Sequence, residues 1–310
     1  MKRIALTCGD PAGVGPEVIE RWLRSLPQVD RDLVVIGPTP WLAGLPLHDD
    51  QLISVGQEEY VAVPGQPDGE SALVAWAAME RAAAGCGAGE FAGVVTGPVS
   101  KARLAQIGYA YPGQTEFFAA HWRGTPTMAF CGGKLRVVLL TWHIPLREVP
   151  AHLTFGNVER TVLAAVELAR AEGISAPRVG VCGLNPHAGE DGLLGTEERD
   201  LIDPMLDRLR LSHPGVSRCQ PGDTLFVRAL RGEFDVVVAL YHDQGLAPLK
   251  VVDFDESVNV TLGLSHVRTS PDHGTAFSIA GKGLANARSF ANAVGLAKRL
   301  VALRAGGNRA

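Results

Sequence analysis

Short, strongly apolar segments alternate along this chain with longer segments of helical pattern, and this alternation constrains the fold more than any other feature. Five of the short segments are rich in Val, Ile and Leu, with little polar alternation: Leu33–Gly37, Ala92–Thr96, Arg136–Thr141, Arg178–Cys182 and Asp235–Leu240. Such runs are typical of strands buried on both faces of a helix-covered, largely parallel sheet. Helices are expected at Pro16–Leu26, Glu70–Ala84, Asn157–Glu172 and Asn286–Arg304. The chain is therefore predicted to be an α/β protein.

Length and composition limit the class of protein. Hydrophobic residues make up 46% and charged residues 20% of the 310 residues, as in ordinary globular proteins of one or two domains. The formal net charge of −4, without a basic run, argues against a nucleic-acid partner. No apolar run approaches the roughly 18 residues that cross a bilayer, and the first residues lack the apolar core of a signal peptide. We expect a cytoplasmic protein without a membrane partner.

The cysteines lie far apart and form no Cys-x-x-Cys pair: Cys8, Cys86, Cys131, Cys182 and Cys219. This spacing argues against a disulfide framework and against a cysteine zinc site. We expect most of them to be small, buried apolar residues.

Histidines follow the ends of the last three predicted strands. They are His143, His187 and His242. In an open α/β sheet, ligands bind beyond the carboxyl ends of the strands. Three imidazoles with one open coordination position are typical of catalytic zinc sites. Because the separations match no short metal motif, the residues alone leave two alternatives open, a metal site and a set of structural, hydrogen-bonded histidines.

Several polar and basic residues are candidates for binding an anionic substrate: Gln114, Thr115, Lys250, Asn259 and Arg268. The last three lie in one passage, Pro248–Ser270, which we interpret as loop, strand and loop. An isolated Lys or Arg is more often solvated surface. The turn at Gln114 and Thr115 could either begin a helix or contact a substrate.

A polar, glycine-bearing segment precedes the last predicted helix and runs from His273 to Asn286. Its glycines let backbone N–H groups approach a ligand closely, although an ordinary turn is the alternative. The motifs GxGxxG, GxxxxGK[ST], HExxH and GxSxG are absent from the sequence. A P-loop kinase and a serine hydrolase therefore have little support.

Six motifs follow one another along nearly the whole chain: Gly9-Asp-Pro-Ala-Gly-Val-Gly-Pro-Glu17, Thr96-Gly-Pro-Val-Ser-Lys101, Gly113-Gln-Thr-Glu-Phe-Phe118, Asn185-Pro-His-Ala-Gly-Glu190, Tyr241-His-Asp-Gln-Gly245 and Val267-Arg-Thr-Ser-Pro-Asp-His-Gly-Thr-Ala276. Together they resemble the PdxA family, the 4-hydroxythreonine-4-phosphate dehydrogenases of pyridoxal phosphate synthesis. The segment from His273 to Asn286 also resembles the cofactor loop of isocitrate and isopropylmalate dehydrogenases.

The resemblance implies a fold with two intertwined α/β domains and an active site in the cleft between them. Residues 1–112 and 260–310 would form the domain with the cofactor loop. Residues 113–259 would form the domain for metal binding and dimerisation. The implied assembly is a homodimer whose active site is shared across the interface.

The resemblance also implies roles for individual positions. The ligands of a divalent metal, usually zinc with Mg, Co or Mn as alternatives, would be His143, His187 and His242. The substrate would contact Gln114, Thr115, Lys250, Asn259 and Arg268, and the catalytic positions would be Lys101 and Asp223. NAD or NADP would contact His273, Gly274, Thr275, Ala276 and Asn286.

The implied reaction is NAD(P)-linked oxidation of a secondary alcohol followed by decarboxylation of the 3-keto acid, here 4-hydroxythreonine 4-phosphate to 3-amino-2-oxopropyl phosphate. Two features depart from the family: Gln114 stands where His is usual, and the stretch Val251–Ser257 is more acidic. Carboxylates facing an anion site would weaken phosphate binding. Threonate 4-phosphate and a cis-dihydrodiol dicarboxylate are therefore alternative substrates, and a non-catalytic metal- or small-molecule-binding protein is a further alternative.

Overall fold

The computed structural model describes residues 3–307, which divide into two compact units. Unit 1 comprises the chain up to Pro126 and from Leu264 onward, and unit 2 comprises Thr127–Gly263. This division differs from the expected boundaries at residues 112/113 and 259/260. The first boundary shifts because α5 (Gln114–His121) belongs to unit 1, where its Phe117 and Phe118 are fully buried in a hydrophobic cluster.

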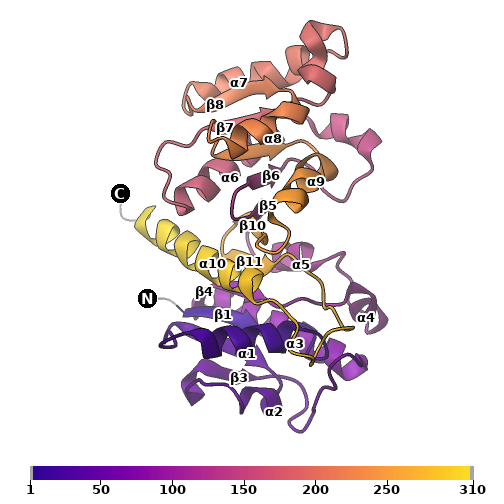
Figure 1. Ribbon diagram of the computed structural model, residues 1–310, viewed down its shortest axis with the longest axis vertical. Helices are drawn as coiled ribbons and strands as arrows, with labels where there is room; N and C mark the ends of the chain where they lie inside the picture. The colour runs from indigo at the N-terminus through magenta and orange to yellow at the C-terminus, as the bar shows by residue number, and fades with distance from the viewer. Residues whose placement is uncertain (1–2, 308–310) are drawn as a thin grey trace. The chain divides into compact units, whose positions relative to one another are not determined.

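Unit 1 contains a parallel sheet in the order β3-β2-β1-β4-β11. Its elements are β1 (Arg3–Thr7), α1 (Gly15–Ser25), β2 (Leu33–Gly37), α2 (Thr39–Leu42), η1 (Asp49–Gln51), β3 (Leu52–Ser54), α3 (Gly69–Gly87), β4 (Phe91–Thr96), α4 (Lys101–Gln106), α5, β11 (Val267–Pro271) and α10 (Arg288–Gly307). The C-terminal helix α10 packs on β11 and β4 (Figure 1).

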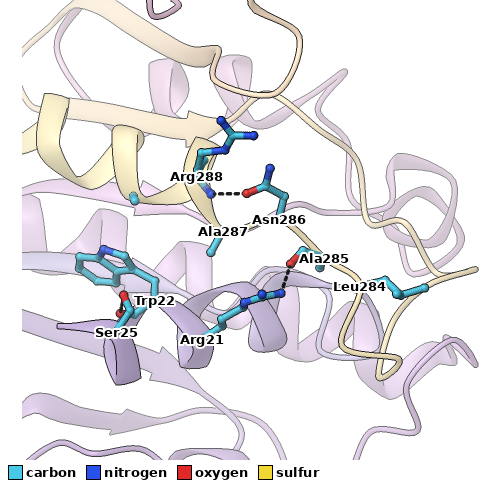
Figure 2. Close-up of a pocket in the computed structure, with 9 residues that line it drawn as sticks. Arg21, Trp22, Ser25, Leu284, Ala285, Asn286, Ala287 and Arg288 are labelled. Carbon is cyan, nitrogen blue, oxygen red and sulfur yellow. Dashed lines mark hydrogen bonds between the residues drawn. The ribbon is translucent and has the colours of Figure 1, made fainter.

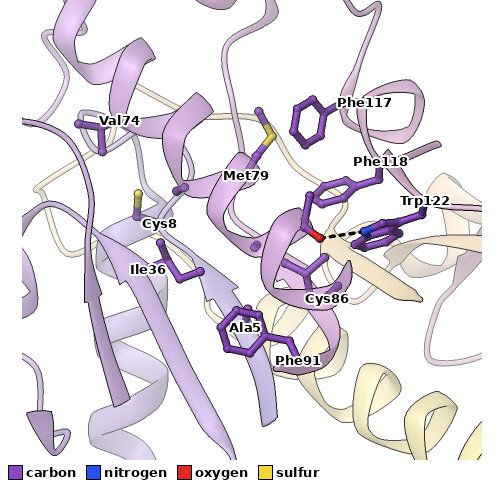
Figure 3. Packing of buried hydrophobic residues seen from close by; sticks show 14 of the residues in the cluster. Ala5, Cys8, Ile36, Val74, Met79, Cys86, Phe91, Phe117, Phe118 and Trp122 are labelled. Carbon is purple, nitrogen blue, oxygen red and sulfur yellow. Dashed lines mark hydrogen bonds between the residues drawn. The ribbon is translucent and has the colours of Figure 1, made fainter. Parts of the chain in front are cut away.

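Apolar burial explains the local structure of unit 1. All five residues of β2 are buried, as its uninterrupted apolar run predicts. Asp68 caps α3 by accepting a hydrogen bond from the backbone N–H of Ser71, which satisfies a donor that the helix leaves unpaired. α3 packs on the sheet together with Phe117, Phe118 and Trp122 (Figure 3). The indole of Trp122 donates to the carbonyl of Ala83, so the polar atom of this buried ring is satisfied.

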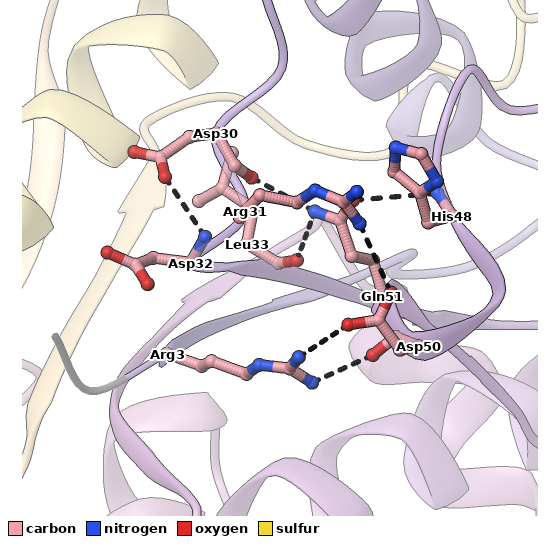
Figure 4. Close-up of polar contacts among 8 residues, drawn as sticks. All are labelled: Arg3, Asp30, Arg31, Asp32, Leu33, His48, Asp50 and Gln51. Atoms are coloured by element: carbon pink, nitrogen blue, oxygen red, sulfur yellow. Dashed lines mark hydrogen bonds and ion pairs between the residues drawn. The ribbon is translucent and has the colours of Figure 1, made fainter.

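A buried glutamine joins the edge strand of unit 1 to its neighbour. The side-chain amide of Gln51, 1% exposed, donates to the carbonyls of Asp30 and Leu33 at 2.9 Å each (Figure 4). Close by, Arg3 pairs with Asp50 on the surface. The amide bonds fix the start of β3 beside β2, although β3 itself is short and half-buried.

Unit 2 contains a second run of strands in the order β10-β5-β6-β9-β7-β8. Its elements are β5 (Gly124–Cys131), β6 (Arg136–Leu139), η2 (Leu146–His152), α6 (Phe155–Ala171), β7 (Val179–Cys182), η3 (Pro186–Gly192), η4 (Glu198–Ile202), α7 (Asp203–Arg210), β8 (Val216–Gln220), α8 (Gly222–Leu230), β9 (Val236–Ala239), α9 (His242–Asp253) and β10 (Val258–Leu264). β5 is antiparallel to β6, whereas β6, β9, β7 and β8 are parallel neighbours.

The predicted α/β class is confirmed, and each predicted strand and helix corresponds to an element of the structure. One interpretation is wrong: Pro248–Asp253 is helical, because α9 continues through Pro248 and carries Lys250 on its last turn. All the cysteines are free thiols, and only Cys219 is not buried. No helix within residues 3–307 has the length and hydropathy of a membrane span.

Candidate functional site

The three histidines singled out in the sequence follow three adjacent strands of unit 2. β6 pairs with β9, and β9 pairs with β7, both in parallel. His143, His242 and His187 lie beyond the carboxyl ends of these strands in that spatial order. This edge of a parallel sheet is where α/β proteins bind ligands.

Two of these histidines lie side by side. The ring centroids of His143 and His242 are 5.6 Å apart and the rings are tilted by 38°. Nδ1 of His242 lies 2.7 Å from Oδ1 of Asp243. Because an ionised carboxylate only accepts hydrogen bonds, Nδ1 carries the proton and the lone pair of Nε2 can bind a metal.

His187 also contacts a carboxylate through its Nδ1, but it lies apart from the pair formed by His143 and His242. Its Nδ1 is 2.7 Å from Oε2 of Glu190, and 62% of its side chain is exposed. Within residues 3–307, no three His, Cys, Asp or Glu side chains come together in metal-binding geometry. The imidazole donors of one chain thus comprise an adjacent pair and a separate, exposed third ring, and both His187 and His242 have the carboxylate contact that orients metal ligands.

Hydrogen bonds fix the strand ends from which these histidines extend. Thr141 donates through Oγ1 to the carbonyl of Leu240 at 2.6 Å, which joins the segments after β6 and β9. Gln244 accepts the Leu240 N–H at 2.7 Å and donates to the carbonyl of Gly183 at 2.8 Å, which joins the segments after β9 and β7. Sequence reasoning did not single out Thr141 or Gln244, because their role depends on strand neighbours that are distant in sequence.

Arg268, on β11 of unit 1, is buried with 4% exposure. Burial lowers the pKa of its guanidinium to about 10. Nη2 donates to Thr96 Oγ1 and Ser270 Oγ, both at 2.9 Å, and to Gln114 Oε1 at 3.2 Å. These three acceptors are neutral and orient the guanidinium, whose charge is also stabilised by the nearby carboxylate of Glu116.

The other unit 1 candidates surround the start of α5. Gln114 is its first residue and donates to the carbonyl of Gly97 at 3.2 Å, while Thr115 is buried. Lys101 begins α4 and is exposed; its Nζ would lie 3.5 Å from a Cβ placed on Gly113. Lys101, Gln114, Thr115 and Arg268 therefore form one polar cluster within unit 1.

The remaining candidates lie in unit 2. Nζ of Lys250 lies over the ring of Phe254, 5.3 Å from its centroid. Asn259 is on β10, and Asp223 is an exposed residue in the first turn of α8.

One carboxylate of the acidic stretch after Lys250 points inward. Asp253 is buried, and its Oδ2 accepts the backbone N–H groups of Lys134 and Leu135 at 3.0 and 2.8 Å. The carboxylate of Asp253 is therefore engaged by the β5–β6 turn, and the weakening of phosphate binding by this acidic stretch stays a prediction.

The glycine-bearing segment of unit 1 is held against α1. Glu17 accepts the N–H groups of Gly281 and Ala285 at 2.8 and 3.3 Å, and Arg21 donates to the carbonyl of Ala285 at 2.9 Å. A cavity of about 430 Å³ lies between Arg21 and Asn286 (Figure 2). Another, of about 730 Å³, is lined by Glu17, Arg21, Gly281 and others.

The segment begins with a histidine whose ring has one nitrogen without a hydrogen-bond partner. Nε2 of His273 is buried and has no hydrogen-bond partner within the described residues. Ala276 has a φ of 44°, and the carbonyl of Thr275 accepts the Val14 N–H at 2.9 Å. Glycines and an unpaired imidazole nitrogen, in a segment whose later residues line the two cavities, fit the binding of a polar cofactor. Sequence reasoning missed Glu17 and Arg21, although Glu17 belongs to the first of the six motifs.

Comparisons with known proteins show which family the chain resembles as a whole. A 4-hydroxythreonine-4-phosphate dehydrogenase from Bradyrhizobium diazoefficiens is 41% identical over 98% of each chain. The crystal structure of the Klebsiella pneumoniae enzyme of that name is 35% identical, with a TM-score of 0.81 over 97% of this chain and 100% of that one. A terephthalate 1,2-cis-dihydrodiol dehydrogenase from Burkholderia xenovorans is 28% identical, with a TM-score of 0.72 over 98% of both chains.

A more distant structure shows the fold alone. A β-decarboxylating dehydrogenase from Thermococcus kodakarensis is 16% identical, with a TM-score of 0.50 over 97% of this chain and 84% of that one. The expected relation to that class of fold is confirmed. The model of the family described as pyridoxal phosphate biosynthetic protein PdxA matches residues 32–297. The chain belongs to the PdxA family.

Proposed function

We propose that this protein is a metal-dependent, NAD(P)-linked dehydrogenase that oxidises 4-hydroxythreonine 4-phosphate and decarboxylates the resulting 3-keto acid. The product would be 3-amino-2-oxopropyl phosphate, a precursor of pyridoxal phosphate. The observation that carries the proposal is the placement of His143, His242 and His187 beyond adjacent parallel strands in a chain of this family. Relatives of about 40% identity bear the name of this activity.

The metal would be held by His143 and His242 of one subunit and by His187 of the partner subunit of a homodimer. Support comes from the adjacent pair of rings and from the separate, exposed position of His187. Zinc suits a set of three imidazoles, with Mg, Co and Mn as alternatives. When bound, the cation would stabilise negative charge on the substrate oxygen during oxidation and decarboxylation.

The substrate's anionic groups would be bound by Arg268 and Lys250, and Lys101 would occupy a catalytic position. Arg268 is buried, and its hydrogen bonds to Thr96 and Ser270 fix the planar guanidinium for bidentate contact with a phosphate or carboxylate. Thr115, Gln114 and Asn259 would supply neutral hydrogen bonds. Asp223 would hold or release a proton close to the substrate.

The dinucleotide would bind at the segment from His273 to Asn286, where it would accept a hydride from the substrate. Because Nδ1 of His273 donates to the carbonyl of Gly274, Nε2 would accept a hydrogen bond from the cofactor, which explains its lack of a protein partner. Gly274, Thr275 and Ala276 would present backbone groups, while Glu17 and Arg21 hold the segment in place. NAD and NADP are both compatible with these contacts.

A second candidate substrate is a cis-dihydrodiol dicarboxylate. The similarity to a terephthalate dihydrodiol dehydrogenase favours it, and so does the glutamine at position 114. It would undergo the same oxidation and loss of carbon dioxide, and Arg268 would bind a carboxylate in place of a phosphate.

The test is reduction of NAD or NADP, followed by absorbance, with the zinc-loaded protein. 4-Hydroxythreonine 4-phosphate, threonate 4-phosphate and a terephthalate dihydrodiol are supplied in separate assays, with His143→Ala protein as the control. Turnover of the first substrate with release of carbon dioxide is expected. Turnover of only one of the others would replace the proposed substrate, and no turnover of any would contradict the proposed activity.

A further inference from the structure

The turn that carries His187 has a backbone that amino acids other than glycine rarely adopt. Five consecutive residues, His187 to Asp191, have φ values of 52°, 53°, 84°, 43° and 54°. Only Gly189 among them lacks a Cβ. In this region Cβ lies too close to the following carbonyl oxygen, so such a run persists only where the surroundings hold it.

A buried carboxylate holds the residue that leads into this turn. Glu198 is 3% exposed. Its Oε1 accepts the backbone N–H of Asn185 at 2.7 Å, and its Oε2 accepts the side-chain amide of Asn185 at 2.9 Å. Both oxygens therefore fix one residue, two positions before His187, through its backbone and its side chain.

The turn also packs directly on the same carboxylate. A Cβ on Gly189 would lie 2.8 Å from Oε2 of Glu198 and 2.8 Å from the carbonyl of Gly195. A Cβ on Gly183, just after β7, would lie 3.0 Å from Oε1 of Glu198. The carboxylate thus fills the space between the end of the strand and the left-handed turn, and no side chain other than hydrogen fits at either glycine.

We infer that Glu198 is a positioning residue for His187, which it holds through Asn185 and through the turn at Gly189. This inference rests on the proposed function, in which His187 completes a metal site in the partner subunit. Glu190 fixes the rotation of the imidazole, whereas Glu198 fixes the backbone from which the imidazole extends. Loss of Glu198 would leave the imidazole of His187 intact, but the position of that imidazole would no longer be fixed.

A neighbouring glutamate provides a matched control. Oε2 of Glu197 also accepts the Asn185 side-chain amide, at 2.7 Å. It does not accept the Asn185 backbone N–H, and it lies near the surface, where water can replace it. Glu197→Gln therefore removes a negative charge that contacts the same Asn185 amide, but it leaves the buried carboxylate of Glu198 in place.

The experiment measures the zinc affinity of the full-length protein by competition with a chelator. Glu198→Ala is expected to lower the affinity about 10- to 100-fold, the usual effect of losing a group that orients a metal ligand. Glu198→Gln should lower it less, because the amide oxygen can still accept the Asn185 N–H. Glu197→Gln should stay within about twofold, as for an exposed polar contact. Equal affinities for Glu198→Ala and the unmodified protein would overturn the inference.

A second variant keeps the test decisive if Glu198→Ala does not fold. Gly189→Ala retains Glu198 and Asn185 but displaces the turn, and it should also weaken zinc binding. In the metal-free protein, amide exchange in residues 187–191 should accelerate in both variants. Gly189→Ala with normal zinc affinity and normal exchange would count against the inference.

The zinc affinity of His187→Ala, measured in the same assay, distinguishes a failure of the proposed metal site from a failure of the role proposed for Glu198. If His187→Ala binds zinc normally, the proposed metal site is wrong. If it loses affinity while Glu198→Ala and Gly189→Ala retain theirs, the metal site stands and only the role of Glu198 is wrong.

Discussion

Arg268 donates a hydrogen bond from Nη2 to Oε1 of Gln114 at 3.2 Å, and Gln114 donates in turn to the carbonyl of Gly97. Both ends of the amide are therefore engaged within unit 1. The residue that departs from the family's usual histidine orients the buried guanidinium. Its effect on a substrate would therefore act through Arg268 as well as through the direct hydrogen bond proposed above.

Replacing Gln114 tests this relationship. Gln114→Ala should raise KM for the anionic substrate about 10-fold, because a hydrogen bond to a charged group contributes about 1.5–3 kcal/mol. Gln114→His should match the unmodified protein above the imidazole pKa and lose affinity below it, since an imidazolium would repel the guanidinium. The measurement is KM from pH 5.5 to 8.5. A pH-independent KM in Gln114→His would contradict the contact.

Mixed dimers test which histidines act together. Because His143 and His242 are adjacent in one chain, mixing His143→Ala with His187→Ala protein should restore one of the two sites in each mixed dimer. Mixing His143→Ala with His242→Ala should restore none, since both sites then lack a ligand from the adjacent pair. Turnover of purified mixed dimers decides the question, and rescue in the second mixture would refute the proposed division of ligands.

The contact between Lys250 and Phe254 should affect substrate binding. An exposed cation–π contact contributes about 0.5–1 kcal/mol, so Phe254→Ala should change KM about two- to fivefold with little change in kcat. Phe254→Tyr keeps an aromatic face and should behave as the unmodified protein. Val251→Ala removes an exposed apolar side chain from the same helix end and serves as the control. An equal change in all three variants would show that the ring has no specific role.

Asp253 should stabilise the fold. Its buried oxygen accepts two backbone N–H groups of the β5–β6 turn, so Asp253→Ala leaves both donors unpaired. We expect a loss of about 2–4 kcal/mol in the free energy of unfolding, at about 1–2 kcal/mol for each donor. Urea denaturation measures this loss. Asp255→Asn, a change at an exposed neighbour, should shift the midpoint little.

Buried thiols predict how stability depends on alkaline pH. Burial raises the pKa of Cys86 and of Cys182 to about 12, from a usual value of 9.0. The folded protein keeps these protons where the unfolded chain loses them, so the stabilising contribution is complete below pH 9 and is lost as pH rises to 12. Denaturation at pH 8, 9 and 10 should show this decline, and it should be smaller in Cys86→Ala.

Much of the fold could be predicted because the central strands are apolar on both faces. β2, β4, β6, β7 and β9 correspond to uninterrupted apolar runs, and burial on both sides requires such runs. α9 was missed at Lys250 because Gly245 and Pro248 usually interrupt helices. The edge strand β3 was missed because it is short and half-exposed, so its sequence carries little apolar pattern.

The residues of the candidate site could be predicted where they directly follow the end of a strand. The ends of β6, β9 and β7 indicate His143, His242 and His187, because strand ends meet at one edge of a parallel sheet. Glu198, Gln244 and the inward Asp253 could not be found this way. Each hydrogen-bonds to a backbone group in another segment of the chain, and no local sequence pattern indicates which segments become neighbours.

The path of the chain through unit 1 bears on how the protein is made. β11 and α10 come from the end of the chain, yet they pair with or pack on β4, which lies within the first hundred residues. Unit 2 is continuous in sequence, so it can fold while the ribosome is still translating the rest. The sheet of unit 1 stays incomplete for longer, because the edge of β4 is covered by β11 only after synthesis has passed Val267. A chain that stops before Val267 would therefore leave the sheet of unit 1, most of which comes from the first 126 residues, without the neighbour of β4.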